Sequence, residues 1–276
     1  MEFRDVRASD IDGLLRLCDL AGWNQTAVDI GRLLALEPLG CFAACEGGRL
    51  VGTTTTTTYG TDLAWVGMVL VDPDYRRRGI ATRLMEKALD YLRGRGVRTV
   101  KLDATPAGRP VYERLGFVAE NPLERWAATG PPPVHHRRGY PVGSWSQIAA
   151  TDRDVFGADR TALMQMIIAD AGPPLVRSGC RVGIGGYAFA RPGRRAGYIG
   201  PVVAEDTGTA WSLLTAVDAD LRPAIIDIDP AFDGATDLLR ERGFAQQREF
   251  VRMRLGPAIR SAESPRVFAI AGPEVG

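Results

Sequence analysis

The chain has 276 residues, of which 45% are hydrophobic and 24% charged, which is typical of a globular protein. Its 34 basic and 33 acidic side chains give a formal net charge of +1, which argues against a broad nucleic-acid-binding surface. Charges or glycines interrupt every apolar run before it reaches membrane-spanning length, and residues 1–5 carry no signal-peptide pattern. We therefore expect a cytoplasmic protein that binds neither nucleic acid nor membrane.

The first half of the chain predicts strands and helices in alternation. A short strand at 3–7 leads to a helix that Ser9 and Asp10 can cap, and Thr26 can cap a second helix. Further strands are expected at 41–46, 50–59, 63–71, 97–104 and 117–127, and further helices at 80–95 and 108–115.

Two of these strands are expected to form a hairpin. Gly47 and Gly48 lie between them and suit a tight turn. The second strand contains the threonine run 53–58, which looks like low complexity. Its β-branched side chains fit a pleated strand better.

Three prolines at 131–133 predict a stiff, extended connector. We place a domain boundary there, which gives a first domain at 1–129 and a second at 130–276. In the second, strands are expected at 181–191, 195–203, 224–228 and 248–255, and helices at 207–221 and 233–242.

The second domain repeats the first faintly. Leu-Arg-Glu-Arg-Gly-Phe at 239–244 parallels Tyr-Glu-Arg-Leu-Gly-Phe at 112–117, so a duplication is plausible. The apolar segment 266–271 is expected either to add as an edge strand or to pack across the interface of the two lobes.

The chemistry is concentrated in the turn between the predicted strand 63–71 and the helix 80–95. Gly79 and Ala81 leave space for a ligand to approach the main chain, and the helix start offers N–H groups and a favourable dipole to an anion. Arg76, Arg77 and Arg78 can add charge-assisted hydrogen bonds. These features predict a pyrophosphate site, although six residues alone would also fit a solvated basic helix start.

In this context the stretch resembles the acetyl-CoA site of GNAT superfamily N-acetyltransferases. Their signature, Gln/Arg-x-x-Gly-x-Gly/Ala, stands here as Arg76-x-x-Gly79-x-Ala81. The strand order of residues 3–127 is similar to the family fold throughout. The resemblance implies an α/β protein with a mixed sheet, built from two tandem GNAT-like domains of which the second is degenerate.

The resemblance also implies which residues bind acetyl-CoA. The strand before the turn would offer main-chain groups to the pantetheine and the acetyl carbonyl. Thr105 stands where many members carry an asparagine that contacts the cofactor arm, and a threonine still donates one hydrogen bond. The full set of implied cofactor-binding residues is Val69, Leu70, Val71, Arg76, Arg77, Arg78, Gly79, Ile80, Ala81, Thr82 and Thr105.

Tyr112 matches the family tyrosine beside the cofactor sulfur. A phenol within hydrogen-bond reach can protonate the leaving thiolate, whereas the alternative reading is a core aromatic next to Leu115 and Phe117. For the general base Asp103 is the first choice, ahead of Asp62 and Glu46. A capping or loop carboxylate is an equally good reading of Asp103, and a water chain can replace a dedicated base.

The second domain lacks these parts. Its counterpart of the anion turn contains Glu205 and Asp206 and no arginine, so it would repel a pyrophosphate, and Leu239 stands where the first domain has Tyr112. Asp227 and Asp229 can hold a cationic amine there, but turn and cap acids are the stronger reading. We expect no second cofactor site.

Other candidates are weaker. His135 and His136 lack nearby Cys or carboxylate ligands, so no metal site is expected. Glycines at 183–186 precede no helix and fit a strand distortion better than a phosphate loop. Trp65, Trp126 and Trp145 can line an acceptor pocket but fill cores more often. Buried free thiols are expected at Cys18, Cys41, Cys45 and Cys180, with a pairing of Cys18 left open.

The implied function is transfer of acetyl from acetyl-CoA to a primary amine of a small molecule, by direct attack in a ternary complex. Two alternatives stay open: a non-catalytic acyl-CoA sensor, and a protein lysine or N-terminal acetyltransferase. The second domain argues mildly against the latter, because it can cap the groove that a peptide would occupy. We expect a monomer or a homodimer, and the sequence does not name the amine.

Overall fold

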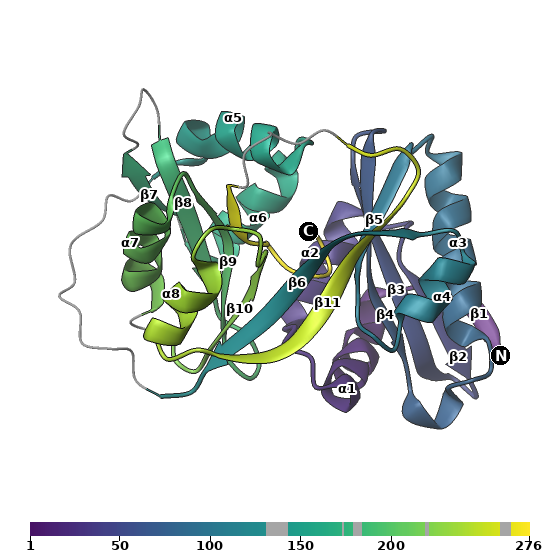
Figure 1. Cartoon of the computed structure of the whole chain (residues 1–276). Coiled ribbons are helices and arrows are strands. Elements are labelled where there is room, and N and C mark those ends of the chain that lie inside the picture. The colour runs from purple at the N-terminus through teal and green to yellow at the C-terminus, as the bar shows by residue number, and fades with distance from the viewer. Residues whose placement is uncertain (131–142, 173, 179–183, 219–220, 260–265) are drawn as a thin grey trace. The chain divides into compact units, whose positions relative to one another are not determined.

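The computed structural model describes residues 1–130, 143–172, 174–178, 184–218, 221–259 and 266–276. They divide into two compact units, and each is discontinuous in sequence (Figure 1). The first unit contains Met1–Ala119, Met253–Ala258 and Glu274–Gly276, and the second contains Glu120–Arg252 and Ile259–Pro273. Of the helices in these ranges, none combines the length and the apolar character needed to cross a membrane.

The first unit is built on a mixed sheet. Its neighbouring strands are, in order, β1 (Glu2–Asp5), β2 (Phe42–Glu46), β3 (Arg49–Tyr59), β4 (Leu63–Val71) and β5 (Thr99–Ala104). All pairs are antiparallel except β4 and β5, which are parallel. The last residues of β11 (Ala245–Leu255) add beside β5, so a segment from late in the chain completes this sheet.

Helices cover both faces of the first sheet. They are α1 (Ile11–Ala21), α2 (Ala27–Leu36), α3 (Ile80–Gly94) and the short α4 (Arg109–Arg114), with 3-10 turns η1 (Ala8–Asp10) and η2 (Pro73–Tyr75). In Figure 1, α3 lies on one side of β3 and β4, and α1 and α2 lie on the other. A Cβ on Gly52 would come within 2.9 Å of Ile80, so the glycine lets α3 pack closely on β3.

Thr26 caps α2 as its sequence predicts. The Thr26 hydroxyl accepts a hydrogen bond from the Asp29 amide at 3.1 Å, and the Asp29 carboxylate accepts one from the Thr26 amide at 2.8 Å. The predicted capping of α1 by Ser9 or Asp10 is wrong in detail. Asp10 instead accepts hydrogen bonds from the Arg7 amide and from the Arg4 guanidinium, and it closes the 3-10 turn before the helix.

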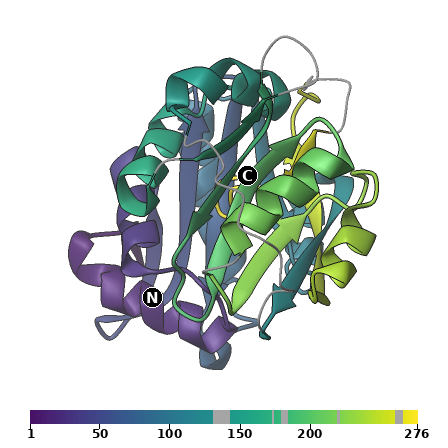
Figure 2. The same ribbon diagram turned by 90° about the vertical axis from the view of Figure 1, so that its left-hand side faces the viewer.

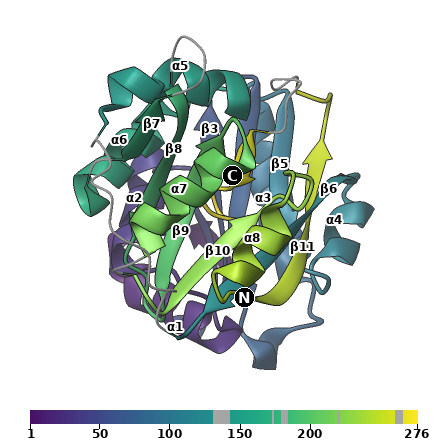
Figure 3. The ribbon, with the colours of Figure 1, turned by 60° about the vertical axis from the view of Figure 1, so that its left-hand side comes forward.

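The second unit repeats this arrangement. Its strands are β6 (Val118–Ala128), β7 (Leu175–Ser178), β8 (Ile184–Arg191), β9 (Gly197–Ala204), β10 (Ala224–Ile228), β11 and β12 (Val267–Ala269). They lie in the order β11-β6-β10-β12-β9-β8-β7. Its helices are α5 (Trp145–Phe156), α6 (Thr161–Ala171), α7 (Thr207–Asp218) and α8 (Ala235–Glu241). The teal helices α5 and α6 contact β8 (Figure 2), and α7 crosses β8 and β9 (Figure 3).

Of the two alternatives given for 266–271, the edge strand is wrong, because β12 lies inside the sheet. β9 and β10 pair in parallel from Gly197 with Ala224 to Ile199 with Ile226, and beyond that point β12 lies between them. Val267 pairs with Val203 on β9, and Ala269 pairs with Ile228 on β10. An interior position suits this segment because Phe268 and Ala269 are fully buried in the apolar core of the unit.

Candidate active site

The site begins where β4 and β5 part. The two strands pair with each other only from Leu63 with Thr99 to Trp65 with Lys101, and no further pair between β4 and β5 follows. β4 continues for six residues beyond Trp65, to Val71. Main-chain groups on the β5 side of this stretch therefore have no ladder partner and are open to a ligand.

Backbone strain is concentrated at the same place. Among the described residues, Met68 and Arg77 are the two non-glycine residues with a left-handed φ, at 51° and 61°. Met68 lies in a bulge, because β4 has two residues, Met68 and Val69, between its pairs with Thr55 and Thr53, where β3 has only Thr54. Arg77 lies in the basic turn. Strain of this kind is held at sites where a special main-chain course is needed.

The basic turn presents donors and no acceptor side chain. Gly79, with φ 73°, is the N-cap of α3, and the first helical amide with a backbone acceptor is that of Arg83, which donates to the Gly79 carbonyl at 3.1 Å. The amides from Arg77 to Thr82 find no acceptor within the described part of the chain. No acidic residue lies in the first helical turn, and residues 76–79 are exposed. The turn can therefore bind an anion.

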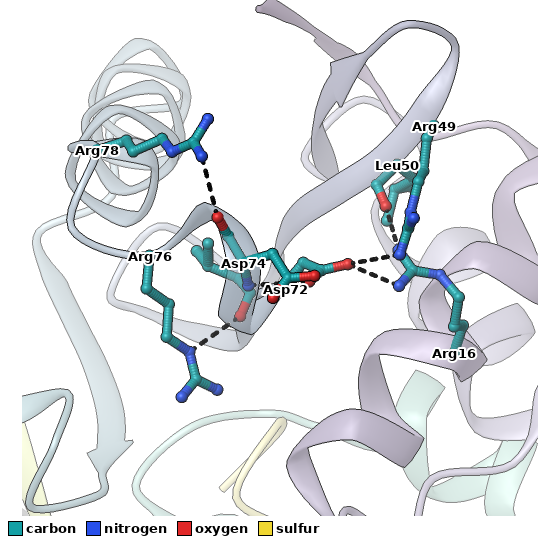
Figure 4. Close-up of polar contacts among 8 residues, drawn as sticks. Arg16, Arg49, Leu50, Asp72, Asp74, Arg76 and Arg78 are labelled. Carbon is teal, nitrogen blue, oxygen red and sulfur yellow. Dashed lines mark hydrogen bonds and ion pairs between the residues drawn. The ribbon is translucent and has the colours of Figure 1, made fainter.

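A buried carboxylate that the sequence reading missed holds this turn in place. Asp72 accepts hydrogen bonds from Arg16 of α1 at 2.7 Å, from Arg49 at 3.1 Å and from the Asp74 amide at 3.2 Å (Figure 4). Arg78 donates to the Asp74 carbonyl at 3.1 Å. Burial acts to raise the Asp72 pKa, but the hydrogen bonds and charges of its partners bring that pKa below its usual value.

Asp72→Asn should lower the free energy of unfolding at pH 7 by about 1–3 kcal/mol, because two arginines lose a charged acceptor. The depressed pKa means that the stabilisation is present above the unfolded-state pKa near about 3.9 and is lost as pH falls through the lower folded-state value. Urea unfolding at pH 7 and at about pH 3 checks this. The difference between wild type and variant should be largest at pH 7 and smaller at the lower pH; an equal difference at both would contradict the assignment.

Two predicted cofactor-binding residues, Val71 on β4 and Thr105 after β5, accept hydrogen bonds from within the chain. The Val71 carbonyl accepts a hydrogen bond from Arg76 Nε at 3.3 Å, so this arginine closes the turn back onto the strand (Figure 4). The Thr105 hydroxyl accepts one from the Gly108 amide at 3.2 Å, at the start of α4. Its own hydrogen remains available as a donor.

Tyr112 lies on α4 and is buried. Its ring meets Phe117 edge-on at 6.1 Å, and a Cβ on Gly108 would lie 3.4 Å from both the Tyr112 and the Thr105 hydroxyl oxygens. The hydroxyls of Tyr112 and Thr105, which the family resemblance assigns to the same site, therefore lie close together. Burial raises the Tyr112 pKa well above that of a free phenol, so the hydroxyl keeps its proton at neutral pH.

The three candidate bases lie in different surroundings. Asp103 is half-buried in β5. It lies two residues beyond Lys101, which pairs with Trp65 of β4, so Asp103 and Trp65 are on the same face of the sheet. Asp62 is exposed and pairs with Arg98 before the start of β4, at the end of the strand remote from the turn. Glu46 lies 3.9 Å from Arg78 and faces the turn. Of the three, Asp103 alone lies beside the diverging strands.

The second unit closes its counterpart of this site in two ways. β12 fills the divergence of β9 and β10, and its neighbour Ile270 donates an amide hydrogen bond to the Asp227 carbonyl at 3.0 Å. At the start of α7, the Asp206 carboxylate accepts a hydrogen bond from the Thr209 amide at 2.6 Å and takes the place of an anion. Leu239 is fully buried and stands where the first unit has Tyr112.

The acids singled out in the second unit have internal partners. Both carboxylate oxygens of Asp227 accept from Arg125 at 2.7 Å, and Tyr198 donates to one of them at 3.0 Å. Asp229 caps a turn by accepting from the Ala231 amide at 2.9 Å. The capping interpretation therefore fits Asp229, and Asp227 belongs to a buried ion pair.

Some of the remaining candidate residues lie in the core, and others lie outside the residues that the structure describes. Trp65 and Trp126 are buried, and Trp145 is half-buried on α5. Cys18, Cys41 and Cys45 are buried free thiols, and burial raises the pKa of the Cys41 thiol to about 12. No group of three potential metal ligands occurs in the described ranges. The connector prolines, both histidines and Cys180 fall outside those ranges.

A sheet that opens between two parallel strands, followed by a helix start that can bind an anion, is compatible with an acyltransferase fold. Comparison with known proteins agrees: the model of the acetyltransferase (GNAT) family matches residues 9–117, and that of an acetyltransferase (GNAT) domain matches residues 148–269. The chain belongs to the GNAT family of acetyltransferases and contains two tandem GNAT domains.

Relatives carry the same description. N-acetyltransferase YitH of Bacillus subtilis strain 168 is 25% identical over 262 residues, or 90% of this chain and 89% of that protein. N-acetyltransferase YhbS of Escherichia coli K12 is 33% identical over 132 residues, or 45% of this chain and 77% of that protein. A solved Pyrococcus horikoshii structure, described as an acetyltransferase, has a TM-score of 0.85 at 24% identity, covers 100% of this chain and 95% of its own, and supports the fold alone.

Proposed function

We propose that the first unit binds acetyl-CoA and transfers its acetyl group to a primary amine of a small molecule, by direct attack in a ternary complex. The observation that carries this proposal is the opening between β4 and β5, which leads directly to a turn with unbonded amides. Family membership supports the acyltransferase class, and the geometry supports a site in this unit.

The residues present suit coenzyme A. The amides from Arg77 to Thr82 and the exposed guanidinium groups of Arg77 and Arg78 match a diphosphate in charge and in hydrogen-bonding capacity. The unpaired main-chain groups of β4, at Val69 and Leu70 in the family position, match the amides of a pantetheine arm. Arg76, Gly79 and Ala81 shape the turn, and Thr105 offers a donor beyond β5.

When bound, acetyl-CoA supplies an acetyl group activated as a thioester. The chain then has two tasks. The Tyr112 hydroxyl holds a proton that it can give to the sulfur as the carbon–sulfur bond breaks. A carboxylate such as Asp103, or water, receives the proton that the attacking ammonium must lose. Burial raises the Tyr112 pKa, so the phenol holds this proton at neutral pH.

Isothermal titration calorimetry with acetyl-CoA should give one site per chain. The first unit has the open strand pair and the basic turn, whereas β12 and Asp206 occupy the corresponding places in the second. A stoichiometry of two would contradict the assignment of a degenerate second unit. Absence of binding would contradict the proposed function as a whole.

A free-thiol assay separates the proposed reaction from its rivals. The panel contains small-molecule amines, amino acids, polyamines, aminoglycosides and peptides, each with acetyl-CoA. Thiol release with a small amine is expected. Binding of acetyl-CoA without thiol release from any member would favour a sensor, and release with peptides alone would favour a protein acetyltransferase.

A further inference from the structure

A row of buried polar atoms without partners lies on one face of β3. The hydroxyls of Thr53, Thr55 and Thr57 are buried and make no hydrogen bond within the described part of the chain. The side-chain oxygen of Gln25, between α1 and α2, is also buried without a partner. Buried oxygens left in this way cost stability unless a ligand or water satisfies them.

This row faces away from α3. Gly52 points toward α3, and side chains alternate along a strand, so Thr53, Thr55 and Thr57 point to the opposite face. Thr55 pairs with Gly67 of β4, and Thr57 pairs with Trp65, which places both β4 residues on the same face. A diphosphate at the start of α3 and this row therefore lie on opposite faces of the sheet, and the opening between β4 and β5 joins them.

The segment Glu274–Gly276 lies on the face of the threonine row. A Cβ on Gly67 would come within 2.6 Å of the Glu274 Cα and carbonyl oxygen, and the Tyr59 hydroxyl donates to the Val275 carbonyl at 2.6 Å. The Glu274 side chain is 5% exposed, and its carboxylate accepts a hydrogen bond from Gln25 Nε2 at 3.0 Å. The buried Glu274 carboxylate is thus held near Gly67, just beyond Trp65, where the pairing of β4 with β5 ends.

We propose that Glu274, Gln25 and the threonine row form the acceptor subsite, and that this subsite binds a primary amine as its ammonium ion. An ammonium group has three donors and no acceptor, which matches a carboxylate, an amide oxygen and hydroxyl oxygens. The carboxylate supplies the compensating charge in a buried site. The proposal rests on the proposed function, because it places the acceptor opposite the cofactor across the same opening.

The test begins with the full chain loaded with coenzyme A. Thermal unfolding is measured with spermidine, L-lysine methyl ester, kanamycin and an alanyl tripeptide amide as cationic probes. At least one of the first three should raise the Tm of the wild-type complex, and Glu274→Gln should abolish that rise. In turnover with the same probe, Glu274→Gln should raise the KM for the amine about 10- to 100-fold and leave the KM for acetyl-CoA unchanged.

Matched variants separate this role from folding. Glu249→Gln removes an exposed carboxylate and should keep the wild-type Tm rise. Gly67→Ala adds a methyl group against the Glu274 backbone and should also raise the KM for the amine, whereas Gly31→Ala meets nothing within 4 Å and should not. If Glu274→Gln does not fold, the comparison of Gly67→Ala with Gly31→Ala still tests the subsite.

The outcomes are distinct. If coenzyme A does not bind to the wild type, the proposed function fails. If coenzyme A binds but no probe among the first three raises the Tm, or if Glu274→Gln and Gly67→Ala leave the KM for the amine unchanged, the acceptor subsite is overturned while the proposed function stands. A response to the peptide alone would overturn both the subsite for a small amine and the small-molecule part of the proposed function, and would leave the acetyl-CoA site in place.

Discussion

Replacing Tyr112 with phenylalanine should lower kcat for thiol release about 10²- to 10⁴-fold, the range of a lost general acid. The affinity for acetyl-CoA should hardly change, because the variant keeps the ring that packs against Phe117 and loses only the hydroxyl. Without that donor, the departing thiolate must take its proton from water. Single-turnover kinetics of thiol release, with calorimetry of acetyl-CoA binding, check both parts.

Tyr91→Phe is a suitable control. Tyr91 lies on α3 and donates to Glu37 at 2.5 Å, so its variant also loses a partly buried hydroxyl but not one beside the site. It should turn over normally. The raised pKa of Tyr112 adds a second expectation: the acid stays protonated up to at least about pH 10, so its titration should not limit the wild-type rate below that pH. Unchanged turnover of Tyr112→Phe would remove Tyr112 as the acid.

The first unit was predictable where local signals agree. Thr26 with Asp29 gives a capping box, the Gly47–Gly48 pair gives the hairpin, and the β-branched threonines give β3. Both the glycine and the arginines of the basic turn act through their own backbone and charge. Such features depend on a few neighbouring residues, and the sequence therefore shows them directly.

In the second unit, α5 and α6 were not anticipated. A capping box of Ser144 with Gln147 marks the start of α5, but we predicted no element between the proline connector and residue 181. The two helices are joined by a buried pair of Asp152 with Arg160 at 2.7 Å, which also engages Tyr187 of β8. The buried Asp152 interrupts the apolar period of α5, so the pattern of that helix was weak.

Contacts between distant residues could not be predicted from one sequence. Arg16 reaches Asp72 across 56 positions, and Gln25 reaches Glu274 across 249. Neither carboxylate stands in a motif, and each looks like an ordinary surface acid until the fold buries it. The position of β12 between β9 and β10 could not be predicted either, because a short apolar segment carries no information about which strands it will pair with.

Replacing Gly256 with alanine should destabilise the first unit far more than an ordinary glycine substitution. Gly256 has φ 102°, and a Cβ there would lie 2.2 Å from the Arg98 carbonyl oxygen, just before β5. Gly96 has a similar left-handed φ of 71°, but its Cβ would meet nothing within 4 Å. Gly96→Ala should therefore cost about 1–2 kcal/mol for the backbone alone, and Gly256→Ala about 3–5 kcal/mol.

The difference between these two variants measures how firmly the late segment Met253–Ala258 completes the sheet of the first unit. Thr99 donates to the Pro257 carbonyl at 2.8 Å, so the segment is fastened at the very start of β5, the strand that forms one side of the opening. Thermal unfolding should show Gly256→Ala melting about 10 °C below wild type. Since a shifted β5 would move the Thr105 and Tyr112 side of the site, affinity for acetyl-CoA should fall with it. Equal effects of the two variants would mean that β5 is held without this segment.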